Sequence, residues 1–132
     1  MYKRQELCGF VARVQPSVGV HDPLVARGLF LDSGDGRLLW LHAELIAVDA
    51  ELTARVKATL QERLSLDPSE VVISATHTHS GPATVPLLNC GTIDPAYMAS
   101  LEERLIDVAA AAMGHTEAVS YTHLTLPTNR EV

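Results

Sequence analysis

Residues 70–82 read Glu-Val-Val-Ile-Ser-Ala-Thr-His-Thr-His-Ser-Gly-Pro. The β-branched run at the start of this segment predicts a strand over residues 70–75, and its length suits a strand buried on both faces. Gly81 and Pro82 end the strand, because glycine tolerates unusual dihedral angles and proline cannot donate to a ladder. The segment therefore places two histidines where a buried strand leaves its sheet.

Two amphipathic helices are predicted on either side of this strand. Asp49 can cap a first helix that ends near Ser65. Asp94 supplies a cap, followed by proline at the first helical position, for a second helix that ends near Gly114. The inward-facing stripes are Leu52, Val56, Leu60 and Leu64 in the first helix, and Met98, Leu101, Leu105, Val108, Ala109 and Ala112 in the second.

Further strands are predicted upstream of the first helix. Residues 8–14 are rich in strand-forming side chains and predict a first strand that ends before Pro16. Residues 26–32 and 37–45 flank a glycine-rich turn and predict a hairpin. The expected fold class is therefore α/β, a mixed β-sheet with flanking helices in the order β-β-β-α-β-α.

The composition narrows the class of protein. The chain has 132 residues, of which 47% are hydrophobic and 20% charged, and this balance predicts one folded domain. The net charge of −6 and the scattered cationic side chains argue against nucleic acid as a partner. No apolar run approaches the ~18 residues of a membrane-spanning helix, so no transmembrane segment is expected. The two cysteines lack C-x-x-C spacing.

Both ends of the chain resemble foreign sequence. Residues 1–5 and 119–123 can be encoded by inverted copies of one DNA element, and residues 124–128 resemble the adjoining adapter of a sequencing library. Residues 1–5 and 119–132 are therefore expected to be non-native, and residues 6–118 to be a fragment whose remaining chain is missing. The alternative is a natural strand after residue 119, where apolar and polar side chains alternate.

His77 and His79 carry the clearest chemical signal. In extended backbone these two side chains project to one side, with their Cα atoms about 6.5 to 7 Å apart. Zinc accepts neutral imidazole nitrogen, and a catalytic zinc site combines three protein ligands with one open position. The histidines are therefore expected to converge on one ion as part of its ligand set. A chance H-x-H in a loop is the alternative.

Residues 75–82, Ala-Thr-His-Thr-His-Ser-Gly-Pro, resemble the A-T-H-T-H-S-G-P signature of the neutral/alkaline non-lysosomal ceramidases and their bacterial relatives. Support comes from Ala26-Arg27 at the head of a strand, from a following strand that ends in an acidic residue, and from the intervening helix. The resemblance covers about residues 9–113. It implies that residues 6–118 are an incomplete part of a larger structure, the N-terminal catalytic domain of a ceramidase-like hydrolase.

The implied activity is that of a Zn²⁺-dependent amidohydrolase, which cleaves the N-acyl amide bond of a small-molecule lipid such as ceramide by metal-activated water. By this resemblance His77 would bind zinc, and His79 would contact the substrate or the zinc-bound solvent. The family's remaining ligands, a histidine, a glutamate and a tyrosine, lie further along full-length members. This fragment alone is therefore expected to be inactive. Members of the family are often secreted.

Other residues leave two alternatives open. His42 and Glu44 lie two positions apart on a predicted strand, and either could complete a metal site in a different metal-dependent hydrolase. A small, non-catalytic, acidic binding domain is the other alternative.

The remaining candidates each have a simpler alternative. His21 could line the mouth of a site or be a solvated loop histidine, and Arg27 could pair with an internal carboxylate or lie at the surface. Ser80 lacks an acid partner for a catalytic triad, and Cys90 could be a reactive thiol or a small buried residue.

Overall fold

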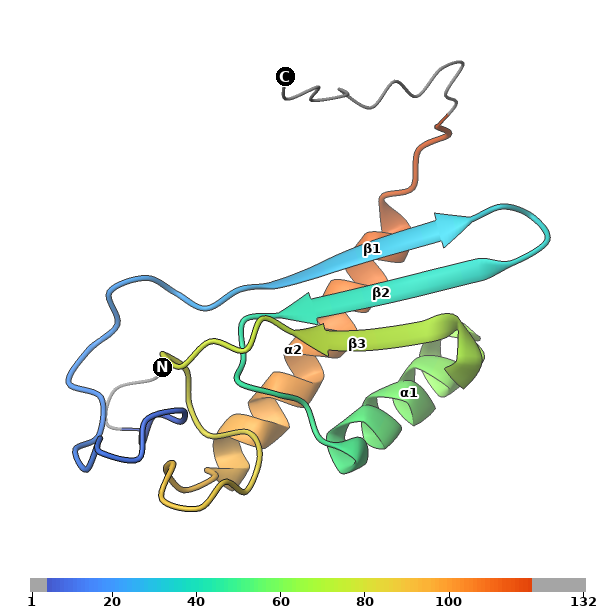
Figure 1. The fold of residues 1–132 in the computed structure, drawn as a ribbon. Helices are drawn as coiled ribbons and strands as arrows, with labels where there is room; N and C mark the ends of the chain where they lie inside the picture. The colour runs from blue at the N-terminus through green and yellow to red at the C-terminus, as the bar shows by residue number, and fades with distance from the viewer. Residues whose placement is uncertain (1–4, 120–132) are drawn as a thin grey trace, which may run out of the picture.

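The computed structural model describes residues 5–119, which form a sheet and two long helices (Figure 1). The fold is α/β, a mixed β-sheet with flanking helices, as predicted. The predicted foreign ends lie outside the described residues except for Gln5 and Val119. The elements in chain order are β1 (Ala26–Asp32), β2 (Arg37–Ala43), α1 (Ala50–Leu64), the 3₁₀ turn η1 (Pro68–Glu70), β3 (Val71–Ala75) and α2 (Pro95–Gly114).

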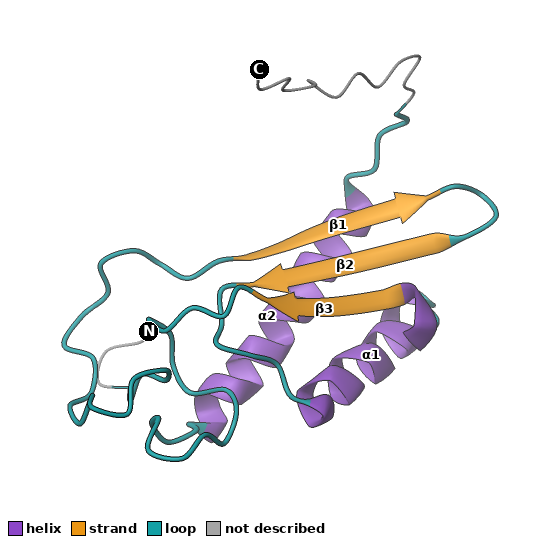
Figure 2. Cartoon of the chain, viewed as in Figure 1, coloured by secondary structure: helices purple, strands orange, loops and turns teal. Residues whose placement is uncertain are grey.

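The strands lie in the order β1-β2-β3, with β2 in the centre (Figure 2). β1 and β2 form the predicted antiparallel hairpin, in whose turn the backbone N–H of Ser33 donates to the carbonyl of Gly36 at 3.0 Å. β2 and β3 run parallel, and α1 supplies the crossover that a parallel pair requires. The carboxyl ends of β2 and β3 therefore meet at the same edge of the sheet.

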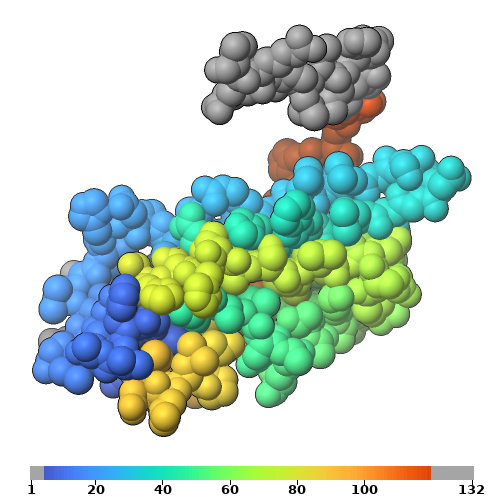
Figure 3. Space-filling view, in the orientation of Figure 1, coloured from blue at the N-terminus to red at the C-terminus, as the bar shows by residue number. Residues whose placement is uncertain are grey.

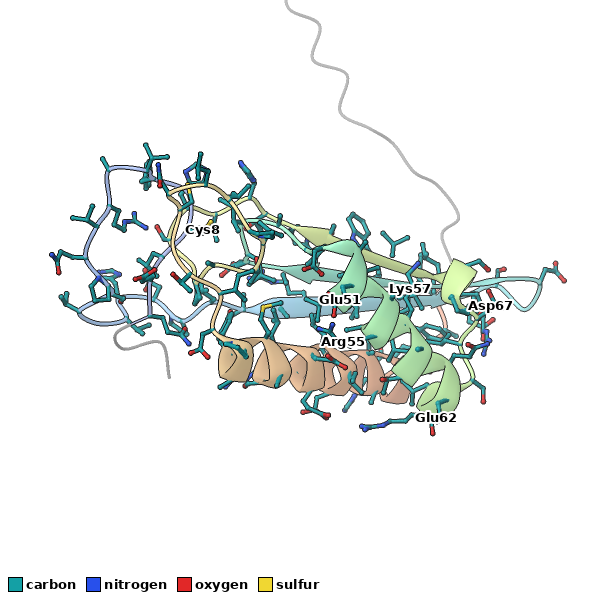
Figure 4. The ribbon with its side chains drawn as sticks, turned by 90° about the horizontal axis from the view of Figure 1, so that it is seen from below. Cys8, Glu51, Arg55, Lys57, Glu62 and Asp67 are labelled. Atoms are coloured by element: carbon teal, nitrogen blue, oxygen red, sulfur yellow. The ribbon has the colours of Figure 1, made fainter. Side chains whose placement is uncertain are left out.

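Both helices pack on one face of the sheet. Leu39 and Leu41 of β2 are fully buried, and they share one core cluster with α1 and α2. Arg55 joins the two helices on the outside, because its guanidinium contacts Glu102 of α2 at 2.8 Å as well as Glu51 of its own helix at 2.8 Å (Figure 4). Burying one leucine stabilises a fold by about 1.5–3 kcal/mol, so this apolar layer is the main source of stability.

The opposite face of the sheet is open. Side chains of all three strands remain exposed there, and Val72 of β3 is 45% exposed. The prediction that this strand is buried on both faces was therefore wrong. The reason is that both helices cover the same face of the sheet, so the other face of β3 has no covering layer among residues 5–119. β3 is also an edge strand of this sheet. The exposed apolar side chains of this face are Leu29, Leu31, Trp40 and Val72.

The predicted first strand over residues 8–14 does not form, so the observed order is β-β-α-β-α. In this region the ladder is limited to one antiparallel bridge between Leu7 and Pro82, followed by a turn. Gly9 has φ +110, and a Cβ there would overlap the ring of His79. The segment is therefore shaped by contacts with the end of β3, and these override its strand propensity.

The predicted helix ends are confirmed. The carboxylate of Asp49 accepts from the backbone N–H of Leu52 at 2.7 Å, and Ser65 ends α1 in the left-handed conformation. Asp94 caps α2 in the same way, ahead of Pro95. Between residues 5 and 119, no helix is both long enough and apolar enough to cross a membrane.

Candidate metal site at the end of strand β3

The two histidines lie at the sheet edge where β2 and β3 both end. Hydrogen bonds continue past β3, since the backbone N–H of Thr76 donates to the carbonyl of Ala43 at 3.0 Å and that of Thr78 to the carbonyl of Leu45 at 3.1 Å. Backbone bonds thus hold the chain on either side of His77. The backbone that carries the histidine is therefore fixed to the segment that follows β2.

His77 is held in an unusual conformation with a defined ring orientation. Its φ is +64, in the left-handed region, which costs a non-glycine residue about 1–3 kcal/mol. The expected extended backbone through His77 was therefore wrong. Its Nδ1 lies 2.9 Å from the backbone carbonyl oxygen of Ile46. Because a carbonyl oxygen only accepts, Nδ1 carries a proton, and in the neutral ring this leaves the lone pair on Nε2.

The rings of His77 and His79 nevertheless come together. Their centroids are 5.1 Å apart, and the ring planes cross at 74°. The sequence predicted that an extended backbone would bring the two rings together. In the structure the left-handed conformation of His77 brings them together instead. The two imidazoles lie side by side at the carboxyl edge of the sheet.

Three residues of the N-terminal segment, Gly9, Phe10 and Arg13, lie against His79, and we call them the wall against His79. The sequence did not predict this contact. The ring of Phe10 meets the ring of His79 edge-on, with a centroid distance of 4.9 Å. The guanidinium of Arg13 stacks on Phe10 and donates to the backbone carbonyl of His79 at 2.9 Å. The bonded residues lie 66 positions apart in the chain, and no local pattern signals this contact. Figure 3 shows the blue N-terminal segment packed beside the yellow loop that follows β3.

His42 and Glu44 do not join the histidine pair. The Nδ1 of His42 bonds the hydroxyl of Ser74 at 2.8 Å on the open face of the sheet, where Trp40 also donates to Ser74. Glu44 accepts from the backbone N–H of Val25 at 3.1 Å and pairs with Arg27 at 3.4 Å. Arg27 thus pairs with a carboxylate, but its side chain is 66% exposed, which agrees with the surface position and not with an internal ion pair.

The remaining candidates are His21, Ser80 and Cys90. His21 bonds the carboxylate of its neighbour Asp22 at 2.7 Å, and its side chain is 96% exposed. His21 and Ser80 line a cavity of about 420 Å³ together with Glu44. Cys90 is buried, as the simpler of its two interpretations predicted.

The histidine pair could supply at most two ligands of a zinc site. Each imidazole can offer one nitrogen, whereas a catalytic zinc site takes three protein ligands. Over residues 5–119, no group of three or more His, Cys, Asp or Glu side chains is arranged to hold a metal ion. Any further ligand must therefore come from outside these residues or from a rearrangement of them.

Comparison with known proteins adds no family assignment. No protein-family model matches the chain, and no solved structure matches it.

Proposed function

We propose that this chain is part of a zinc-dependent amidohydrolase of the neutral ceramidase type, with His77 as a zinc ligand and His79 as a contact for the substrate beside it. The observation that carries this proposal is the 2.9 Å hydrogen bond between Nδ1 of His77 and the carbonyl of Ile46. Histidine ligands of metals commonly donate their second ring nitrogen to a carbonyl or carboxylate in this way, which fixes tautomer and orientation.

The other histidines between residues 5 and 119 lack this combination. His42 bonds the hydroxyl of Ser74, which can donate or accept, so its tautomer is not fixed. His115 has the same kind of bond as His77, from Nδ1 to the carbonyl of Ala111 at 2.8 Å, but it lies on an exposed helix end. His77 combines a fixed tautomer with a second imidazole at 5.1 Å. That combination favours His77 as the ligand.

When bound, zinc would polarise the amide carbonyl and lower the pKa of a water molecule towards ~7. The chain's own residues prepare the site for this. The Ile46 carbonyl orients His77, while Phe10 and the Arg13 bond to the His79 backbone hold the second imidazole against the first. The site is therefore pre-organised on one side by the carboxyl end of β3 and on the other by the N-terminal segment.

An apolar substrate is supported by the side chains around this end of the sheet. The N-terminal segment and the loop after β3 expose apolar side chains of the kind that a folded domain ordinarily buries or uses for binding. Phe10 itself is 51% exposed. The other exposed apolar side chains of these two segments include Val11, Val14, Val18, Val20, Leu87 and Leu88. A lipid amide matches such a surface better than a polar amide does.

The first test is zinc titration of the chain, followed by the NMR signals of the histidine rings. We expect the signals of His77 and His79 to shift together and to saturate. The substitution His77→Gln should abolish the shift of both rings. The matched control is His115→Gln, which removes a histidine with the same backbone hydrogen bond and should leave the response intact. Equal responses at all histidines, or none at His77, would favour the non-catalytic binding domain.

The second test is the genomic reading frame across both ends of this sequence. We expect the frame to continue into a longer chain that supplies further histidine, glutamate and tyrosine candidates. Zinc-dependent hydrolysis of a ceramide analogue should then be found in the longer protein and be absent from residues 1–132 alone. A gene that encodes Met1 to Val132 as written would contradict the truncated amidohydrolase.

A further inference from the structure

The two cysteines of the chain belong to one small apolar cluster, which also contains Ile46, the hydrogen-bond partner of His77. Cys8 is fully buried and Cys90 is 8% exposed, and both belong to a cluster separate from the main core. Both thiols are free and buried, and burial together with the neighbouring Cys90 raises the pKa of the Cys8 thiol. The sequence separates these residues widely and shows no C-x-x-C pattern, so the pairing is a product of the fold. Figure 4 labels Cys8 where the N-terminal segment meets the loop that follows β3.

The backbones that carry the two thiols are held together on both sides. The backbone N–H of Cys8 donates to the carbonyl of Gly81 at 3.0 Å, next to the bridge between Leu7 and Pro82. On the other side, a Cβ placed on Gly91 would lie 3.1 Å from the carbonyl oxygen of Leu7. The two chain segments are thus in direct backbone contact. This proximity of the two segments is a precondition for a disulfide between Cys8 and Cys90.

Glu6 and Gln5 fasten the same two segments. The carboxylate of Glu6 accepts from the backbone N–H of Thr92 at 2.7 Å, and the amide of Gln5 donates to Asp94 at 2.8 Å. The thiol pair is accordingly held in place in the reduced protein.

We propose that Cys8 and Cys90 form a reversible disulfide that locks the N-terminal segment onto the loop after β3 and so fixes the wall against His79. Gly9 and Phe10, which contact the His79 ring, directly follow Cys8. With free thiols, as in the structure, these residues already contact His79, and oxidation would make the contact more rigid. Disulfide formation does not depend on whether His77 binds zinc.

The reaction needs an oxidant, which we take to be a small disulfide such as oxidised glutathione. The Cys90 thiol, which retains some exposure, loses its proton and attacks one sulfur of the oxidant, and a glutathione thiolate leaves. The Cys8 thiolate then attacks the Cys90 sulfur of the mixed disulfide, and the second glutathione leaves. The two protons end on the two glutathione thiols. Burial raises the pKa of the Cys8 thiol, and the neighbouring Cys90 adds to this rise, so the second step should be slow at neutral pH.

The test is equilibration of the folded chain in glutathione buffers of graded redox potential, followed by intact mass and peptide mapping. We expect loss of two hydrogen atoms per chain and a peptide in which Cys8 is joined to Cys90. The oxidised form should melt higher than the reduced form by about 10 °C, because the bond closes a long loop. Amide exchange over residues 77–81 should slow on oxidation by a larger factor than exchange in α1, which reports the global stabilisation alone.

Two variants separate the disulfide from general effects of the oxidant. Cys8→Ala and Cys90→Ala should each lose the oxidant-dependent rise in melting temperature. Mixed disulfides without the internal bond, disulfide-linked dimers as the main product, or an oxidised wild-type chain that melts no higher than the reduced one would each overturn the proposed disulfide. An internal disulfide that slows exchange over residues 77–81 by no larger factor than in α1 would overturn its coupling to His79.

Discussion

Arg37, at the start of β2, and Glu70, at the end of η1, form a two-point ion pair. Nε of Arg37 lies 2.9 Å from Oε1 of Glu70, and Nη2 lies 2.7 Å from Oε2. The same Glu70 carboxylate accepts from the backbone N–H of Asp67 at 2.7 Å and completes a capping box around η1. One carboxylate thus connects the start of the central strand to the turn that leads into β3. This contact helps to set the parallel register of Leu39 with Val71.

Glu70→Gln should reduce the stability that the fold loses as the pH falls. The Arg37 side chain, and next the backbone N–H of Asp67, lower the pKa of Glu70 from its ordinary value of 4.5. A carboxylate with a lowered native pKa stabilises the fold above its unfolded pKa, and this contribution is lost as the pH falls through the native pKa. We therefore expect Glu70→Gln to melt lower than the wild type at pH 7 and the difference to shrink towards pH 3.

The control for this prediction is Glu103→Gln. Glu103 pairs with Arg63 at 3.7 Å between two exposed side chains, and such pairs contribute little. Its melting temperature should follow that of the wild type at both pH values. If Glu70→Gln melts like the wild type at pH 7, the two-point ion pair contributes nothing measurable.

Gly9→Ala should disturb the wall against His79. Gly9 has φ +110, and an added Cβ would overlap the His79 ring, so either the ring or the N-terminal segment must move. We expect a loss of about 1–3 kcal/mol in the free energy of unfolding and a shifted NMR signal of the His79 ring. Gly19→Ala is the control, because nothing lies within 4 Å of a Cβ placed at Gly19. Equal effects of the two substitutions would count against a close contact at Gly9.

Leu60→Ala should show that α1 is held by its apolar stripe. Leu60 is fully buried in the core between α1 and the sheet, so the substitution removes buried methyl groups and leaves a cavity. We expect a loss of about 2–5 kcal/mol, measured by urea unfolding. Leu88→Ala removes the same atoms from a side chain that is 87% exposed and should change stability by less than about 0.5 kcal/mol. Comparable losses would mean that the core is loosely packed.

The open face of the sheet should cause self-association. Leu29 and Leu31 of β1 are 48% and 51% exposed on an edge strand, and exposed apolar edges promote pairing between chains. We expect concentration-dependent association on size-exclusion chromatography, which the double substitution Leu29→Thr and Leu31→Thr should reduce. Val18→Thr changes a loop residue that is 98% exposed and should have no such effect. A wild-type chain that stays monomeric at high concentration would contradict the prediction.

The sequence by itself determined the elements whose signals are local. Asp49 and Ser65 mark the ends of α1, and Asp94 with Pro95 marks the start of α2, because a cap is made by bonds within a few residues. The spacing of apolar residues placed the buried stripe of each helix, and the glycine-rich turn placed the hairpin. The two histidines could also be predicted to lie together, since only one residue separates them.

The tertiary structure decided what surrounds the histidines and how the N-terminal segment folds. Residues 8–14 have the composition of a strand, yet Gly9 turns there because the His79 ring occupies the space beside it. The bond from His77 to Ile46 and the meeting of Cys8 with Cys90 likewise join distant parts of the chain. Such contacts form only when the whole core closes and carry no short-range pattern. Local bonding therefore made the helices and the hairpin predictable, while packing between distant segments shaped the site.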